Sequence, residues 1–155
     1  MPAAPAAAAQ RSASRPAADR LSAAEQRWLL TVDQLVANTV DSGRDGSFTG
    51  GSTARAQALI ADPMTLFETV TAFAVYASCS ETLAAAGSPS NRLRAIRDAV
   101  RTACRQLVPA SALFGAATRD KRPAGLVKAD RQAVAGVVLM RKAAARLAAF
   151  HKATA

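Results

Sequence analysis

Residues 124–152, AGLVKADRQAVAGVVLMRKAAARLAAFHK, decide the fold class of this chain. No proline interrupts them, so they predict one helix about 43 Å long at 1.5 Å per residue. The residues in its middle, AVAGVVLM at 133–140, are apolar on every side of that helix. A helix without a polar side is stable in water only when other parts of the protein cover it. The chain is therefore predicted to be an all-α bundle that buries the middle of this helix.

The first predicted helix begins at a capping box formed by Ser22 and Glu25, in which each side chain accepts a hydrogen bond from the other residue's backbone N–H. Its apolar residues recur at three- and four-residue steps, so one side of the helix should pack inward. These residues are Trp28, Leu29, Val32, Leu35, Val36, Thr39 and Val40. Four glycines within DSGRDGSFTGGST, residues 41–53, predict that this helix ends between Asp41 and Gly43.

Two further main helices are predicted between the first and the last. Asp62 followed by Pro63 is a strong helix start. The helix that follows should run to about residue 86, and its uncharged stretch TVTAFAVYASCS is typical of a central helix surrounded by protein. The next helix is expected from residue 91 to about Leu107, because Pro109 cannot continue it. Short helices are expected at residues 53–61 and 109–117.

Length and composition fit one helical domain preceded by a disordered arm. A chain of 155 residues has the usual size of a single domain, and its 40 alanines suit closely packed helices. We expect residues 21–155 to form an antiparallel bundle of three to four main helices plus one or two short helices. Residues 1–20 hold three prolines and no large apolar residue after Met1, so they are predicted to be disordered, with an organellar address as the alternative.

The positive charge of the chain is concentrated in its second half. The net charge is +9, but residues 1–88 carry six basic and eight acidic side chains, whereas residues 89–155 carry fourteen basic and three acidic ones. A field of one sign attracts partners of the opposite sign. The second half is therefore expected to face an anionic partner. The alternative is that the 16 arginines reflect the codon bias of a GC-rich genome.

A row of basic residues is the candidate binding site for that partner. The candidates are Arg94, Arg97, Arg101 and Arg105, with Arg119, Lys121 and Arg122 of the following turn. The first four fall within an arc of about 80° on one helix. Such a row can engage successive phosphates or an acidic helix, because each guanidinium offers paired donors to an oxyanion. The alternative is a solvated helix edge whose arginine stems cover apolar neighbours.

The two cysteines are predicted to be free thiols. Cys79 and Cys104 lie on consecutive predicted helices, and counting from the turn between them leaves an offset of about 9 Å along an antiparallel pair. That offset exceeds the comfortable reach of a disulfide. The expected location is cytoplasmic, because the alanines of residues 1–20, broken by prolines, do not form the apolar segment of a secretory signal. Two buried thiols fit that reducing compartment.

No set of residues in the sequence predicts catalysis, and no cofactor or metal is expected. Glu68 and Glu81 are about 20 Å apart along a helix, too far for an acid–base pair, although each could meet an arginine of a neighbouring helix. The loop after the first helix matches a calcium loop only in part, since Gly43 and Ser52 replace two ligating residues. It is interpreted as a flexible connection. His151, in the last turn of the last helix, is expected at the surface.

The sequence supports three functional hypotheses. The first is a non-catalytic assembly or adaptor protein that binds itself or another protein, because two helices that are apolar all round exceed what a small bundle needs. The second is a non-specific binder of the nucleic-acid backbone that uses the arginine row. The third is a helical-bundle enzyme or sensor for a small anionic ligand. No membrane span is expected, because the uncharged run is shorter than the roughly 20 residues that a bilayer requires.

Overall fold

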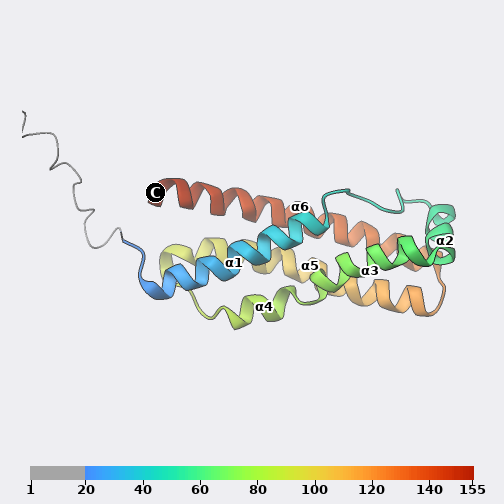
Figure 1. Cartoon of the computed structure of the whole chain (residues 1–155), viewed down its shortest axis with the longest axis horizontal. Helices are drawn as coiled ribbons and strands as arrows, with labels where there is room; N and C mark the ends of the chain where they lie inside the picture. The colour runs from blue at the N-terminus through green and yellow to red at the C-terminus, as the bar shows by residue number, and fades with distance from the viewer. Residues whose placement is uncertain (1–19) are drawn as a thin grey trace, which may run out of the picture.

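Every regular element is a helix in the computed structural model, which describes residues 20–155. The elements are α1 (Ala23–Ser42), α2 (Thr53–Ala61), α3 (Pro63–Ala77), α4 (Cys79–Ala85), the short 3-10 helix η2 (Asn91–Leu93), α5 (Arg94–Arg119) and α6 (Pro123–Thr154). Figure 1 shows an elongated bundle along which α5 and α6 run side by side. The predicted all-α fold is confirmed. The predicted disordered arm lies outside the described residues, apart from Arg20.

The long helices α5 and α6 form the centre of the bundle. Their buried residues recur in alternating steps of three and four, which is the spacing of a coiled-coil seam. On α5 these residues are Ile96, Val100, Ala103, Leu107, Ala110, Phe114 and Ala117; on α6 they include Leu126, Ala133, Met140 and Leu147. A Cβ atom at Gly136 would lie 2.6 Å from the side chain of Leu107. Small residues on the seam therefore let the two helices approach closely.

Helix α1 packs against this pair and begins as the sequence predicts. The hydroxyl of Ser22 accepts a hydrogen bond from the backbone N–H of Glu25 at 3.1 Å, and the Glu25 carboxylate accepts one from the backbone N–H of Ser22 at 2.7 Å. Trp28 is buried, and its indole N–H donates to the carbonyl of Gly87 at 3.2 Å. The predicted capping box is confirmed, and the indole bond ties α1 to the connection that precedes α5.

The prediction that Pro109 ends a helix is wrong, because α5 continues through it to Arg119. Pro109 lies on the exposed side of α5, where the carbonyl left without its usual donor can face water. Leu107 and Ala110, on either side of it in sequence, are both fully buried. Packing against α6 therefore holds the helical path despite the cost of the proline.

Two predictions of all-round burial are also wrong. The helix expected from Pro63 to residue 86 is broken at Ser78, whose hydroxyl donates to the carbonyl of Val75 at 3.0 Å. Its first part, α3, lies at the edge of the bundle, so one side of α3 is open to solvent. Within residues 133–140 of α6, Val138 is 43% exposed. The absence of charged residues shows that these segments are apolar, but it does not show which side of each helix is covered by a neighbouring helix.

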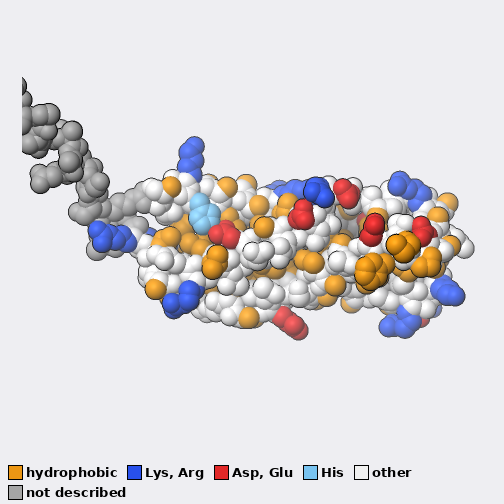
Figure 2. Space-filling model, viewed as in Figure 1, with side chains coloured by type: hydrophobic (Ala, Val, Ile, Leu, Met, Phe, Trp, Pro, Cys, Tyr) orange, Lys and Arg blue, Asp and Glu red, His pale blue; other side chains and the backbone are white. Residues whose placement is uncertain are grey.

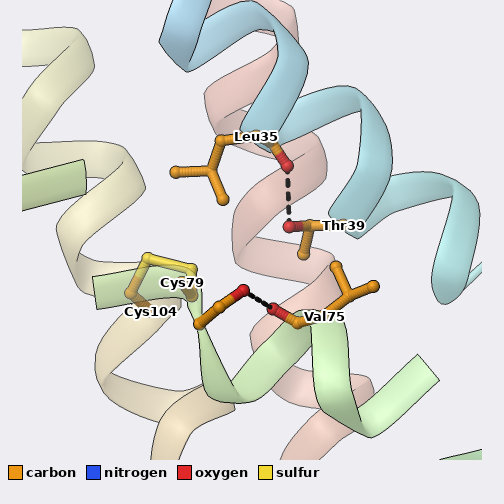
Figure 3. Close-up of a disulfide and its surroundings, with 6 residues drawn as sticks. Leu35, Thr39, Val75, Cys79 and Cys104 are labelled. Atoms are coloured by element: carbon orange, nitrogen blue, oxygen red, sulfur yellow. Dashed lines mark hydrogen bonds between the residues drawn. A yellow bond between two sulfur atoms is a disulfide. The ribbon is translucent and has the colours of Figure 1, made fainter. Parts of the chain in front are cut away.

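The prediction of free thiols is wrong, because Cys79 and Cys104 form a disulfide with their Cα atoms 5.4 Å apart. Figure 3 shows this bond between the first residue of α4 and the middle of α5, close to Leu35 and Thr39 of α1. Both cysteines are buried. Because α5 proper starts only at Arg94, the offset between the cysteines along the helices falls to about 6 Å. An offset of that size lies within the Cα separation that a disulfide can span.

None of the helices within residues 20–155 is by itself long and apolar enough to cross a membrane. The stretch Thr53–Ala61 together with Pro63–Ala85 meets the length and composition test only as a pair bent by 105°.

Candidate interaction surface

One side of α3 forms an exposed apolar surface. Asp62 caps this helix, accepting hydrogen bonds from the backbone N–H of Met64 at 3.1 Å and from the hydroxyl of Thr65 at 2.6 Å. Thr69, Phe73 and Tyr76 are buried and fix which side of α3 faces inward. The residues on the opposite side, Met64, Phe67, Val70 and Ala74, are here called the α3 stripe. Met64 is 78% exposed and Phe67 is 69% exposed. Few large apolar side chains of a folded protein are this exposed.

The α3 stripe has an acidic border. Glu68 lies on α3 next to the stripe, and Asp62 stands at the start of the helix, whereas α3 itself carries no lysine or arginine. Glu68 is exposed and has no ion-pair partner among residues 20–155. Figure 2 shows acidic side chains beside hydrophobic ones over the end of the molecule where α2 and α3 lie. A partner with basic groups around an apolar centre would fit this surface.

The four arginines of the row lie on α5, but they differ in whether their guanidinium groups are already bound by other side chains. Arg94 donates to the side-chain oxygen of Asn91 at 2.6 Å, and Arg97 pairs with Asp98 at 3.1 Å. Arg101 and Arg105 are exposed, and neither has a hydrogen bond or ion pair to any residue from 20 to 155. The guanidinium groups of Arg101 and Arg105 are therefore the two that remain available to a partner. We call these two residues the α5 basic pair.

The predicted extension of the row lies far from its start. Arg119 ends α5 and lies 3.9 Å from Asp120, while Lys121 adopts a positive φ of 51° in the turn before α6. Arg122 is exposed and precedes the first residue of α6. Arg94 and Arg119 are separated by about 37 Å along α5. The seven predicted residues thus share one helix and its following turn without forming one compact site.

A buried carboxylate that the sequence did not single out organises the loop between α1 and α2. Asp130 is 2% exposed and accepts hydrogen bonds from the hydroxyls of Ser47 and Thr49, each at 2.5 Å. It also accepts from the backbone N–H of Thr49 at 3.2 Å and of Phe48 at 3.4 Å. The loop is therefore anchored to α6, which corrects its interpretation as a flexible connection. Asp130 is the only acidic residue of α6. A single acidic residue on an otherwise basic helix is the feature of the sequence that could have singled it out.

A cavity of about 220 Å³ lies where this loop meets α3 and α6. Phe48, Phe73 and Tyr76 supply aromatic walls, and Arg141 of α6 also lines the cavity. The guanidinium of Arg141 donates to the backbone carbonyl of Gly43 at 3.1 Å. Burial raises the pKa of Tyr76 to about 12, with Arg141 opposing that rise and Asp130 adding to it. The phenol is therefore neutral at physiological pH.

The remaining residues considered from the sequence lie apart from this surface. His151 is 44% exposed, and its Nε2 atom lies 2.9 Å from both carboxylate oxygens of Asp33 on α1. The expected pairing of Glu68 or Glu81 with an arginine is wrong, since neither has an ion-pair partner within residues 20–155. In that same part of the chain, no group of three or more His, Cys, Asp and Glu side chains could hold a metal ion.

The chain matches no protein-family model, no curated protein and no solved structure.

Proposed function

We propose that this chain is a non-catalytic assembly protein whose copies associate by packing the α3 stripe of one copy on the α5 basic pair of the next. The observation that carries the proposal is the exposure of Met64 and Phe67 on the same side of one helix. Contiguous apolar surface of this kind marks interaction sites, because leaving it in water forgoes about 25 cal/mol per Å² of burial. Association with a partner would recover that free energy.

The distribution of charge favours a second copy as the occupant of the α3 stripe. The stripe is bordered by Glu68 and contains no basic residue, so two stripes facing each other would gain no ion pair. Arg101 and Arg105 are exposed cations on a different helix, α5, and make no ion pair to any residue from 20 to 155. One and two turns further along α5, the exposed residues are Pro109 and Ala112, whose small side chains leave room for large side chains of a partner. Complementary charge of this kind selects and orients partners.

Association between two different faces of one chain has a recognisable outcome. Each copy bound in this way still presents one free stripe and one free basic pair. Such heterologous contacts close into rings or continue as filaments, whereas two identical faces would stop at a dimer. We therefore expect species larger than a dimer as the protein concentration rises, and we expect their population to fall with added salt.

Sedimentation velocity over a range of protein and salt concentrations tests the proposal. The double variant Met64→Ser/Phe67→Ser should sediment as a monomer, and so should Arg101→Glu/Arg105→Glu. Leu30→Ser is the matched control, because Leu30 is 73% exposed on α1 outside the stripe; it should assemble like the parent chain. A parent chain that stays monomeric at every concentration, or a stripe variant that assembles unchanged, contradicts the proposal.

The same variants separate assembly from nucleic-acid binding. A backbone binder should lose affinity for duplex DNA with a log–log salt slope of about −0.9 per phosphate neutralised, and Arg101→Gln/Arg105→Gln should reduce that slope. If the parent chain is a monomer and shows this slope, nucleic-acid binding replaces assembly as the function of the basic pair.

We infer an oxidising compartment as the working location of the chain. Disulfides persist in oxidising compartments and are rare in the cytoplasm. The cytoplasmic location expected from the sequence fits free thiols, whereas Cys79 and Cys104 form a buried disulfide. Thiol labelling of the endogenous protein, denatured directly on cell lysis so that the buried cysteines become accessible, tests this inference. Labelling only after reduction supports it, and labelling without reduction contradicts it.

A further inference from the structure

We propose that the cavity bounded by α3, α6 and the loop after α1 binds a small organic ammonium ion with a short apolar chain. This inference does not rest on the proposed assembly: Met64 and Phe67 lie outside the cavity lining, and Glu68, which borders the α3 stripe, is the residue that the two sites share.

Aromatic rings form one part of the cavity wall. Phe73 contacts Phe48 at a centroid distance of 5.6 Å and Tyr76 at 5.3 Å, both edge to face. Ala72, Val134 and Val137 supply aliphatic surface between them. Rings present a negative quadrupole to a cation placed over them, and apolar walls favour an alkyl chain. Such walls suit a ligand that combines a cationic group with a hydrocarbon part.

The charged groups of the lining are mostly acidic. Glu68, Asp45 and Asp130 contribute three carboxylates, against the single guanidinium of Arg141. The hydrogen bond from Arg141 to the carbonyl of Gly43 leaves the charge of Arg141 in place, but the three carboxylates outnumber it, and Glu68 and Asp45 have no ion pair to any residue from 20 to 155. The available charge at the cavity is therefore negative, which favours a cation over the anionic ligand considered from the sequence.

Tyr76 presents an unpaired hydroxyl to the cavity. The residue is 4% exposed and lines the cavity, and its hydroxyl makes no hydrogen bond to any residue from 20 to 155. Among these residues the fully buried side-chain atom without a partner is Oγ1 of Thr118, so the Tyr76 hydroxyl is open to the cavity, where a ligand can pair with it in place of water. A neutral phenol can accept a hydrogen bond from an ammonium group.

The position of Tyr76 is held by its neighbours rather than by a hydrogen bond. A Cβ atom at Gly43 would lie 3.1 Å from the Tyr76 hydroxyl and 2.6 Å from the methyl groups of Val137. The absence of a side chain at Gly43 therefore preserves the space around the phenol. The cavity of about 220 Å³ is smaller than the roughly 300 Å³ at which pockets for drug-sized ligands begin. A ligand of about five heavy atoms is the size that we test.

Isothermal titration with three probes of equal length tests the proposal on the full chain. The probes are n-butylammonium, n-butanol and butyrate, which differ mainly in charge. We expect n-butylammonium to bind at least about tenfold more tightly than either of the others, because a charged hydrogen bond contributes more than a neutral one. Equal binding of n-butanol or butyrate, or no binding of n-butylammonium, overturns the proposal.

Two variants and one control locate the binding. Tyr76→Phe keeps the aromatic packing and removes only the hydroxyl, and Glu68→Gln removes one charge; each should weaken n-butylammonium binding by about five- to tenfold. Glu81→Gln, on α4 and outside the lining, should bind like the parent chain. Melting temperatures close to that of the parent chain establish that the variants are folded. Parent-like affinity in Tyr76→Phe places the ligand elsewhere and overturns the assignment.

Discussion

Asp130 and Gly43 determine the geometry around the cavity through very different properties. Asp130 places a carboxylate inside the bundle, where four donors of the loop satisfy it. Gly43 acts through the side chain that it lacks, since Val137 and Tyr76 occupy the space that a Cβ atom would need. Neither role could be predicted from the sequence, because each depends on a contact between segments about 80 to 95 positions apart. Helical periodicity describes only local order.

Glu25 should make the stability of the chain depend on pH. Hydrogen bonds from Arg92, Ser90 and the backbone of Ser22 hold the pKa of this carboxyl far below its ordinary value of 4.5. A group with a lowered pKa in the folded state stabilises the fold above the unfolded-state pKa, and this contribution is lost as the pH falls below it. Between about pH 6 and 3, Glu25→Gln should therefore lose less stability than the parent chain in urea unfolding.

The control for this prediction is Glu81→Gln, because Glu81 is exposed and has no ion pair within the described residues. Its stability should follow pH as that of the parent chain does. The same pH dependence in Glu25→Gln and the parent chain would show that the contacts with Arg92 and Ser90 do not matter for folding.

Helix boundaries were predictable from the sequence where local chemistry sets them, and not where packing does. The capping box at Ser22 and the Asp62–Pro63 start are satisfied within a few residues of the chain, and both helices begin there. Pro109 and Ser78 were misread for opposite reasons. Packing against α6 carries α5 past the proline, whereas α3 stops at a residue that helical periodicity would pass over. Long-range packing decided the outcome at Pro109, whereas at Ser78 the hydroxyl donates to the carbonyl of Val75 where the helix ends.

Pro109→Ala should stabilise the chain. Proline inside a helix lacks the N–H that the carbonyl four residues earlier would accept, and its ring crowds that carbonyl. Because Pro109 is exposed, replacing it removes no buried contact. The free energy of unfolding in urea should rise by about 1 to 3 kcal/mol. A decrease would mean that Pro109 itself is needed for the packing of α5 on α6.

The disulfide should contribute to stability by joining α4 to α5. It closes a loop with a sequence separation of 25 residues, for which the loss of chain entropy in the unfolded state corresponds to about 3 kcal/mol. Cys79→Ala/Cys104→Ala should lower the free energy of unfolding by that amount. A thiol assay of the folded and the denatured parent chain should detect no free thiol. Two free thiols in the denatured chain would contradict the pairing.

The whole molecule is held together along one axis, since α6 contacts α1, α2 and α5 over its length. Figure 1 shows α6 extending beside α1 towards the C-terminus. The sequence indicated this central role through the apolar middle of the last helix. It could not indicate that α3 would stay at the edge, because an uncharged helix can be either buried or left for a partner. The candidate surface on α3 therefore emerged only from the arrangement of the whole bundle.

Deleting residues 143–155 should destabilise the whole bundle rather than fray one end. Ala143 and Leu147 in this segment are buried, and Phe150 packs against the same core. Losing the burial of Leu147 and Phe150 should cost about 3 to 5 kcal/mol, and the facing side of α1 would be exposed to water.

Deleting only residues 152–155 is the control, because this shorter deletion retains the side chains of Ala143, Leu147 and Phe150. Because α1 and α5 both depend on α6, circular dichroism and tryptophan fluorescence of the longer deletion should report one unfolding transition at lower urea. Two separate transitions, with Trp28 released first, would instead show that α1 can detach while α5 and α6 remain paired.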